Sequence, residues 1–179
     1  MNLLLTDCPV NLPFVDNKTN RYLDLSQLNI KNCIGCFGCW TKTPGKCVIR
    51  DDATKVYPLI AKSENIIYVS RVKFGTYDAI MKTMLERAIP IQKAFIQLHH
   101  GETHHMQRDV VEKNAVIIAY GCDNREEQDL FQRLVARNAY NMRFQTHKVL
   151  FVFKEELEQA MQLFCICVKL ASVEKLMEE

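Results

Sequence analysis

Four cysteines stand close together in one short stretch of the chain. Cys33, Cys36 and Cys39 follow one another at intervals of three positions, and Cys47 completes the set. Two-residue spacers let successive thiolates converge on one centre, and the glycines between them relieve crowding of the backbone. Such a set can hold an iron-sulfur cluster, bind zinc, act as a dithiol switch or remain as reduced thiols on a tight loop. The spacing alone leaves these alternatives open.

Composition limits the classes of protein to which the chain can belong. With 179 residues, 48% of them hydrophobic, residues 1–179 are expected to form a single domain. The formal net charge is +2 and no basic block is present, so nucleic acid is not an expected partner. The apolar run Leu163 to Val168 is too short to span a membrane, and Met1 to Asp7 does not resemble a signal peptide. We expect a cytoplasmic protein whose thiols stay reduced.

Apolar runs alternate with amphipathic stretches along the chain. Strands are expected at Asn2 to Thr6, Arg21 to Leu25, Asn65 to Val72, Ala115 to Tyr120 and Lys148 to Phe153. Helical stripes are expected from Tyr77 to Ala88 with Thr76 as N-cap, from Leu130 to Val135, and from Leu157 to Ala171. Asp52 is expected to cap a further helix, with Pro58 delaying its start by about two to four residues.

Strands that alternate with crossover helices predict an α/β fold with a parallel sheet covered on both faces. Five strands favour the flavodoxin-like three-layer sandwich with strand order 2-1-3-4-5. In that order the ligand crevice lies at the carboxyl ends of the first and third strands. Residues that follow those strands are therefore candidates for binding.

Several motifs together resemble one family. They are the cysteine run from Cys33 to Cys39, then Gly45 to Cys47, the helix start Asp51-Asp52, the strand end Ser70 to Gly75 and the helix end Leu85-Glu86-Arg87. The chain resembles the flavodoxin-like NAD(P)H-dependent FMN reductase family, including its iron-sulfur flavoprotein branch. This resemblance implies an oxidoreductase that uses FMN, with NAD(P)H as electron donor, and a homodimer or homotetramer with FMN at the subunit contact.

The resemblance also implies which residues bind the cofactors. FMN-binding residues are expected at Arg71, Val72, Lys73, Phe74, Gly75, Tyr120, Gly121 and Cys122. A [4Fe-4S] cluster, if present, is expected at Cys33, Cys36, Cys39 and Cys47. Arg71 and Lys73 stand where the family has Pro and Tyr. They could stabilise reduced flavin, bind its phosphate or remain solvated.

The segment Cys8 to Tyr22 departs from the family. It has no glycine and little helical periodicity, so the first crossover helix is expected to be shortened or missing, and with it the phosphate loop. The leading hypothesis is an FMN-dependent NAD(P)H oxidoreductase, in which no side-chain acid or base is strictly required. The alternatives are a degenerate, non-catalytic subunit paired with a flavinylated homologue, and a [4Fe-4S] electron-transfer flavoprotein.

Other candidate residues give weaker signals. Four histidines stand between His99 and His105 in a long polar connection, where we favour a lid or a dimer contact over a metal site. Cys165 and Cys167 are expected to be packing residues on one helix.

Overall fold

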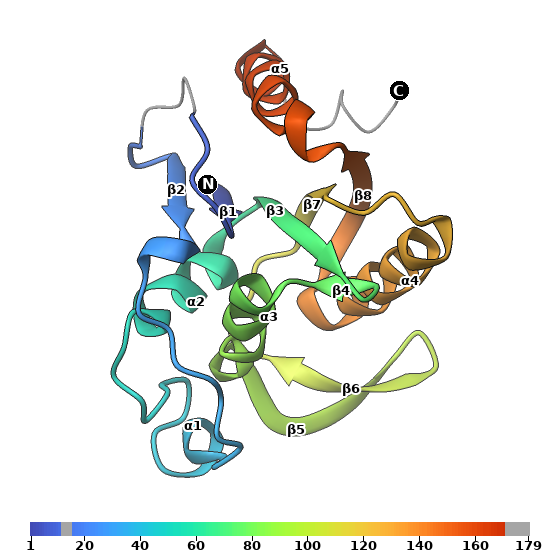
Figure 1. Ribbon diagram of the computed structural model, residues 1–179. Coiled ribbons are helices and arrows are strands. Elements are labelled where there is room, and N and C mark those ends of the chain that lie inside the picture. Colours follow the sequence, from blue (N-terminus) through green and yellow to red (C-terminus); the bar gives the residue numbers. More distant parts are fainter. Residues whose placement is uncertain (12–15, 171–179) are drawn as a thin grey trace.

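The computed structural model describes residues 1–11 and 16–170, with side chains described as far as residue 163. Its main sheet contains five parallel strands in the order β2-β1-β3-β7-β8, which confirms the predicted order (Figure 1). The strands are β1 (Asn2–Thr6), β2 (Asn20–Asp24), β3 (Asn65–Lys73), β7 (Lys113–Tyr120) and β8 (Phe144–Val152).

Helices cover the two faces of this sheet unequally (Figure 1). On one face lie α2 (Ala53–Lys62), α3 (Ala79–Glu86) and α4 (Arg125–Met142), and on the other lies α5 (Leu157–Leu170). The short helix α1 (Gly38–Thr41) lies within the cysteine segment, and 3-10 helices occupy Leu25–Gln27, Ile89–Ile91 and Lys154–Glu156.

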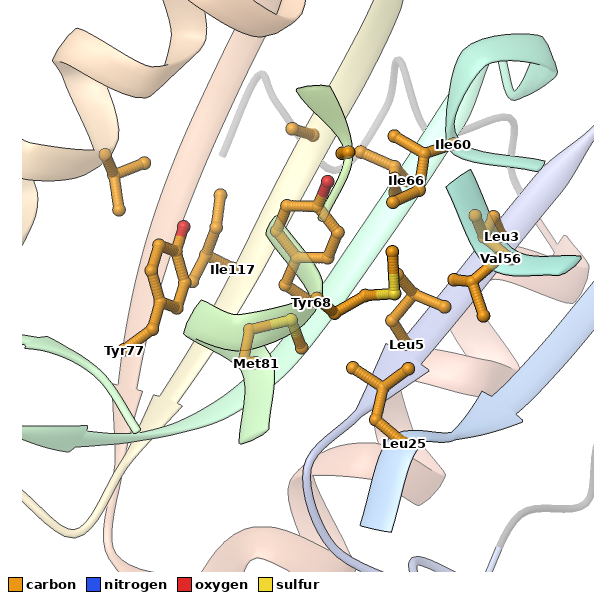
Figure 2. Packing of buried hydrophobic residues seen from close by; sticks show 14 of the residues in the cluster. Leu3, Leu5, Leu25, Val56, Ile60, Ile66, Tyr68, Tyr77, Met81 and Ile117 are labelled. Atoms are coloured by element: carbon orange, nitrogen blue, oxygen red, sulfur yellow. The ribbon is translucent and has the colours of Figure 1, made fainter. Parts of the chain in front are cut away.

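The core follows from the alternation of side chains along the strands. Leu3 and Leu5 of β1 pack on the side of α2 and α3, where Figure 2 shows them with Tyr68 and Met81. Leu4, between them, points to the opposite face and packs with residues of α5. Apolar residues at successive positions are therefore all buried, as expected for a parallel strand covered on both sides.

The connection between β1 and β2 explains the unequal covering. Its described residues, 7–11 and 16–19, contain no helix, as predicted for this segment. Val10 from this connection and Leu157 and Met161 of α5 are buried against the second face. Tyr22 and Leu150 on the same face are only partly buried. The missing helix therefore leaves the second face less covered than the first.

Two predicted helix starts are wrong. The chain turns back directly after β3, so Thr76 and Tyr77 form the short antiparallel strand β4 (Thr76–Tyr77) on β3, and the N-cap of α3 is Asp78 rather than Thr76. Helix α2 begins at Ala53 without delay and contains Pro58. The carboxylate of Asp51 accepts a hydrogen bond from the Ala53 N–H, which fixes the first turn before the proline is reached.

The histidine-rich connection is a β-hairpin formed by β5 (Gln92–His99) and β6 (Glu102–Gln107), outside the main sheet (Figure 1). Its role as a lid or interface stays a prediction. The side chains of Cys165 and Cys167 lie outside those that the structure describes. Within the described residues, no helix has the length and apolar character needed to cross a membrane.

Candidate redox site

Two loops meet at the carboxyl ends of β3 and β7. The backbone has positive φ angles at Phe74 (55°), Gly75 (69°) and Gly121 (71°), so each loop turns sharply as its strand ends. A Cβ atom added at Gly121 would lie 3.5 Å from Cγ of Arg71, so the arginine side chain lies directly over this glycine. Sequence-predicted residues from both loops are therefore brought together.

The exposed part of this junction carries positive charge and one aromatic ring. The Phe74 side chain is 79% exposed, and Nζ of Lys73 lies 5.7 Å from the centre of its ring. Arg71 is also exposed. Such a surface can contact a flat aromatic ligand and attract an anionic group.

Three predicted flavin-binding residues instead turn their side chains into the protein. Val72 is 3% exposed and belongs to the core on the α3 side. Tyr120 is 6% exposed and packs on the opposite face of the sheet. Cys122 is 9% exposed, with its Sγ 3.6 Å from a carboxylate oxygen of Glu127, and burial raises the pKa of its thiol. These residues can offer a ligand only their backbone groups.

Directly after β1, Asp7 forms a buried hydrogen-bond network that the sequence analysis missed. Its carboxylate accepts hydrogen bonds from the Arg71 N–H (2.7 Å), the Ser70 hydroxyl (2.9 Å) and the Tyr120 hydroxyl (2.8 Å). Burial raises the pKa of Asp7 despite these bonds, which lower it. A charged residue placed directly after a buried strand was the available signal.

The Asp7 network bears on where a phosphate group could bind. In the doubly wound folds a phosphate lies on the backbone N–H groups at the start of the first crossover helix. Here a carboxylate occupies the end of β1, and the described part of the following connection has no helix. Because a carboxylate accepts hydrogen bonds and repels anions, this end of β1 does not suit phosphate.

The four clustered cysteines line one small apolar cavity of about 30 Å³. Cys33 and Cys36 are exposed, whereas Cys39 and Cys47 are partly buried. Burial raises the pKa of Cys39, and the negative charge of thiolates at Cys47, Cys33 and Cys36 raises it further. As placed, the described residues contain no group of three or more His, Cys, Asp or Glu side chains that could hold a single metal ion.

A buried ion pair anchors the base of the cysteine segment. Arg87, at the end of α3, donates from Nη1 to Asp51 Oδ2 (2.7 Å) and from Nη2 to Asp51 Oδ1 (2.9 Å). The same guanidinium donates to the carbonyls of Lys31 and Ile49 and to Sγ of Cys47 (3.4 Å). The hydrogen bonds from Arg87 lower the pKa of Asp51 although burial opposes this. Arg87 therefore ties both ends of the segment to the core.

Further contacts hold the segment in place. The Tyr57 hydroxyl accepts a hydrogen bond from the Cys47 N–H (3.2 Å), and the Asp52 carboxylate accepts one from the Asn29 N–H (3.0 Å). Trp40, within the segment, packs against His105 of the hairpin at 4.7 Å between ring centres, with the two rings tilted by 41°. The loop that carries the cysteines is thus held by contacts with α2 and α3 and by the contact of Trp40 with the hairpin.

Comparison with known proteins agrees with these features. The chain is 32% identical over 75 residues to an iron-sulfur flavoprotein of Methanocaldococcus jannaschii, covering 42% of this chain and 38% of the relative. It is 34% identical over 74 residues to an iron-sulfur flavoprotein of Clostridioides difficile, covering 41% and 32%. The chain resembles the iron-sulfur flavoproteins. This similarity confirms the resemblance that its motifs indicated, although it spans only about a third of the length of these relatives. No protein-family model matches the chain.

Solved structures show the same fold. An FMN-dependent NADH-azoreductase of Bacillus anthracis, solved with FMN, superposes with a TM-score of 0.56 at 10% identity and covers 96% of this chain and 100% of its own. An NAD(P)H:quinone oxidoreductase of Methanothermobacter marburgensis gives a TM-score of 0.52 at 9% identity, covering 92% and 95%. The fold of this chain is therefore the flavodoxin-like fold of such reductases.

Proposed function

We propose that this chain is an FMN-dependent oxidoreductase that takes electrons from NAD(P)H. The observation that carries the proposal is the meeting of the carboxyl ends of β3 and β7, where Arg71 lies over Gly121, together with the exposed Phe74 in the turn that follows β3. The similarity to iron-sulfur flavoproteins and the shared fold support it. When bound, FMN would accept a hydride from the nicotinamide and pass its electrons to an acceptor.

In this proposal the residues of the chain bind and orient the cofactor. The exposed Phe74 offers a surface for stacking. Because Asp7 makes the end of β1 unsuitable for an anion, the phosphate is held by the exposed cations Arg71 and Lys73 in place of a helix N-terminus.

Comparing FMN with riboflavin tests this assignment, since the two differ only in the phosphate. The wild-type chain is expected to bind FMN more tightly than riboflavin. Arg71→Gln should weaken FMN binding by about tenfold or more, the loss of one charged hydrogen bond, and leave riboflavin binding unchanged. Lys62→Gln, at the exposed end of α2, is a matched control that should change neither the affinity for FMN nor the affinity for riboflavin.

Two results would contradict the proposal. One is the absence of FMN binding at high FMN concentration together with no NAD(P)H oxidation by the FMN-reconstituted protein. The other concerns only the phosphate assignment, namely an Arg71→Gln protein that keeps the wild-type preference for FMN over riboflavin.

A specific observation favours a second function, electron transfer through a [4Fe-4S] cluster. The four clustered cysteines lie close together on one loop, whose two ends the Arg87 guanidinium holds through Lys31 and Asp51. A cluster is larger than a single ion, so its thiolates lie further apart than those of a zinc site. Anaerobic purification followed by iron and acid-labile sulfide analysis tests it, with Cys36→Ser expected to lose iron and Cys8→Ser, on another loop, to retain it. A colourless, iron-free wild-type protein contradicts this function.

We also propose that a second subunit completes the flavin site. The hairpin strand β5 exposes three large apolar side chains, Phe95 (72%), Ile96 (64%) and Leu98 (78%). Surfaces of this kind mark protein contacts. Native mass spectrometry distinguishes a homo-oligomer from a pairing with a flavinylated homologue, and a monomer that binds FMN stoichiometrically would refute the need for a partner.

A further inference from the structure

A cavity of about 510 Å³ lies between the end of α4, the start of β8 and the turn of the β5–β6 hairpin (Figure 1). This volume is within the roughly 300–1,000 Å³ of small-molecule sites. Glu112, which directly precedes β7, and Phe144, which begins β8, both line it. The cavity therefore lies at the amino ends of these strands, whereas Arg71 and Gly121 lie at the carboxyl ends of β3 and β7.

Three aromatic rings form one wall of the cavity. The ring of His99 lies 4.3 Å from that of His100 and 6.3 Å from that of Tyr140, measured between ring centres. The ring of His100 lies 6.1 Å from that of Tyr140. His100 is exposed and Tyr140 is 40% exposed, so a ligand can reach both rings from solvent. A flat ring can pack against such a wall.

Arg143 brings to the cavity a positive charge that has no anionic partner. Its side chain lines the cavity and, among the described residues, makes no hydrogen bond or ion pair. Arg87 and Arg137, by contrast, are paired with Asp51 and Glu102. A free guanidinium presents parallel N–H donors whose spacing matches the two oxygens of a carboxylate.

The imidazoles decide the sign of the charge in the cavity. Of its described lining residues, only Glu112 is acidic, and its carboxylate accepts a hydrogen bond from the Gln145 side chain (2.8 Å). The end of α4 adds about half a negative charge beside Arg143. Arg143 alone therefore does not make the cavity positive, but protonation of its histidines does.

The groups around His99 lack negative charge when they are protonated. Those that face it are His100 in the hairpin turn, His104 of β6, which is hydrogen-bonded to Glu102, Tyr140 and Arg143 at the end of α4, and Glu112. Loss of solvation lowers the pKa of His99, and the charges of His100, Arg143 and His104 lower it further. Glu112 raises this pKa with the smallest effect of all. A bound anion would supply the missing negative charge.

We propose that this cavity binds a ring-bearing carboxylate, whose anionic group lies against Arg143 and whose ring packs against His99 and Tyr140. The guanidinium donates to the carboxylate, while Ala136 and Ala139 of the lining contact the apolar part. Because Glu112 lies nearby, a singly charged carboxylate fits better than a doubly charged phosphate. Binding of the anion and protonation of the imidazoles favour each other. The site does not depend on the proposed flavin function.

A matched pair of probes tests the proposal. The carboxylate 2-naphthoate is negatively charged, and 2-naphthamide has the same rings with a neutral amide. Each is titrated into the isotope-labelled protein while amide NMR signals are followed, with EDTA present so that no metal ion bridges the histidines. Near pH 6 we expect saturable binding with shifts at the signals of His99, Tyr140 and Arg143. The preference for 2-naphthoate should be roughly tenfold or more, as one charged hydrogen bond supplies.

The pH dependence tests the part played by the imidazoles. The preference for 2-naphthoate should be roughly threefold or more smaller near pH 8 than near pH 6, because the imidazoles lose their protons while the probe stays ionised. The double variant His99→Gln with His100→Gln should lose most of this difference. An unchanged preference across this pH range in the wild-type protein would overturn the coupling to protons.

Further variants separate the guanidinium from the cavity. Arg143→Gln should bind the two probes with nearly equal affinity, and glutamine meets the same backbone restriction at a φ of 58° as arginine does. Ala136→Leu narrows the cavity from α4 and should weaken both probes. Arg125→Gln, at the opposite end of α4, removes the same charge and should keep the wild-type preference.

Three results would overturn the proposed site. They are a lack of saturable 2-naphthoate binding near pH 6 up to its solubility, shifts confined to residues away from the cavity, such as those around Arg71 and Gly121, and an Arg143→Gln protein that keeps the wild-type preference. Because the free variants are compared by thermal unfolding, loss of binding through misfolding is recognised directly.

Discussion

Arg87→Met is the substitution whose effect follows most directly from the structure. The guanidinium of Arg87 forms two hydrogen bonds to Asp51 and reaches the carbonyl of Lys31 and Sγ of Cys47. Methionine is similar in length and apolar, so it fills the space but makes none of these bonds. The substitution therefore leaves the Asp51 carboxylate buried and without its cation.

The size of the effect depends on burial. The side chains of Arg87 and Asp51 are only 1% and 4% exposed, and removing one partner of such a pair costs about 3–5 kcal/mol of the free energy of unfolding. Replacing both, as Arg87→Met with Asp51→Leu, removes the unpaired charge as well. The double variant should thus be more stable than the two single losses added together predict, by about 3 kcal/mol.

Urea unfolding followed by circular dichroism at pH 7 measures these differences. The control is Arg137→Met, which breaks an ion pair with Glu102 whose side chains are 59% and 42% exposed and should cost at most about 1 kcal/mol. A parallel measurement of Cys47 reactivity toward a thiol reagent reports whether the cysteine segment loosens. If Arg87→Met costs no more than the control, or if the double variant is strictly additive, the anchoring role of this pair is wrong.

Three further predictions concern single sites. Burial raises the pKa of Asp7 above its unfolded value of 3.8, so between these two pKa values the folded state binds more protons than the unfolded state. The free energy of unfolding should therefore fall as the pH rises through this range. Asp7→Asn should abolish the fall, which is measured as the urea midpoint at each pH. Burial lowers the pKa of Lys113 to about 8, so Lys113→Met should raise the free energy of unfolding at pH 7 by up to about 3 kcal/mol, and an unchanged value would refute the cost of burying this amine. Gly75→Ala places a Cβ 2.5 Å from Leu130 at a φ of +69°, whereas Gly101→Ala at +79° meets nothing within 4 Å; Gly75→Ala should lower the melting temperature more, and equal losses would show that Leu130 moves aside.

Local sequence signals predicted much of the fold. Continuous apolar runs marked the buried parallel strands, because strands covered on both faces need apolar residues at successive positions. The short, glycine-free segment after β1 predicted that no crossover helix follows, since too few residues remain for one, and its described residues 7–11 and 16–19 contain none. The start of α3 was missed because β4 depends on pairing with β3, which is not encoded by helical periodicity.

The candidate site was predicted only in part. The sequence identified the cysteine segment and the loops that carry Arg71 and Gly121, because their motifs are local. It also predicted flavin contacts at Val72 and Tyr120, and the alternation of side chains across the sheet leaves only their backbone groups available for such contacts.

What the sequence determined by itself is the order of the five parallel strands, the clustering of the cysteines and the family they resemble. These properties depend on residues near one another in the chain. The tertiary structure alone decided that Arg87 pairs with Asp51, that Asp7 occupies the end of β1, and that the Tyr68 hydroxyl is buried without a hydrogen-bond partner among the described residues. Each of these depends on groups brought together by packing from distant parts of the chain, and no spacing in the sequence records such a contact.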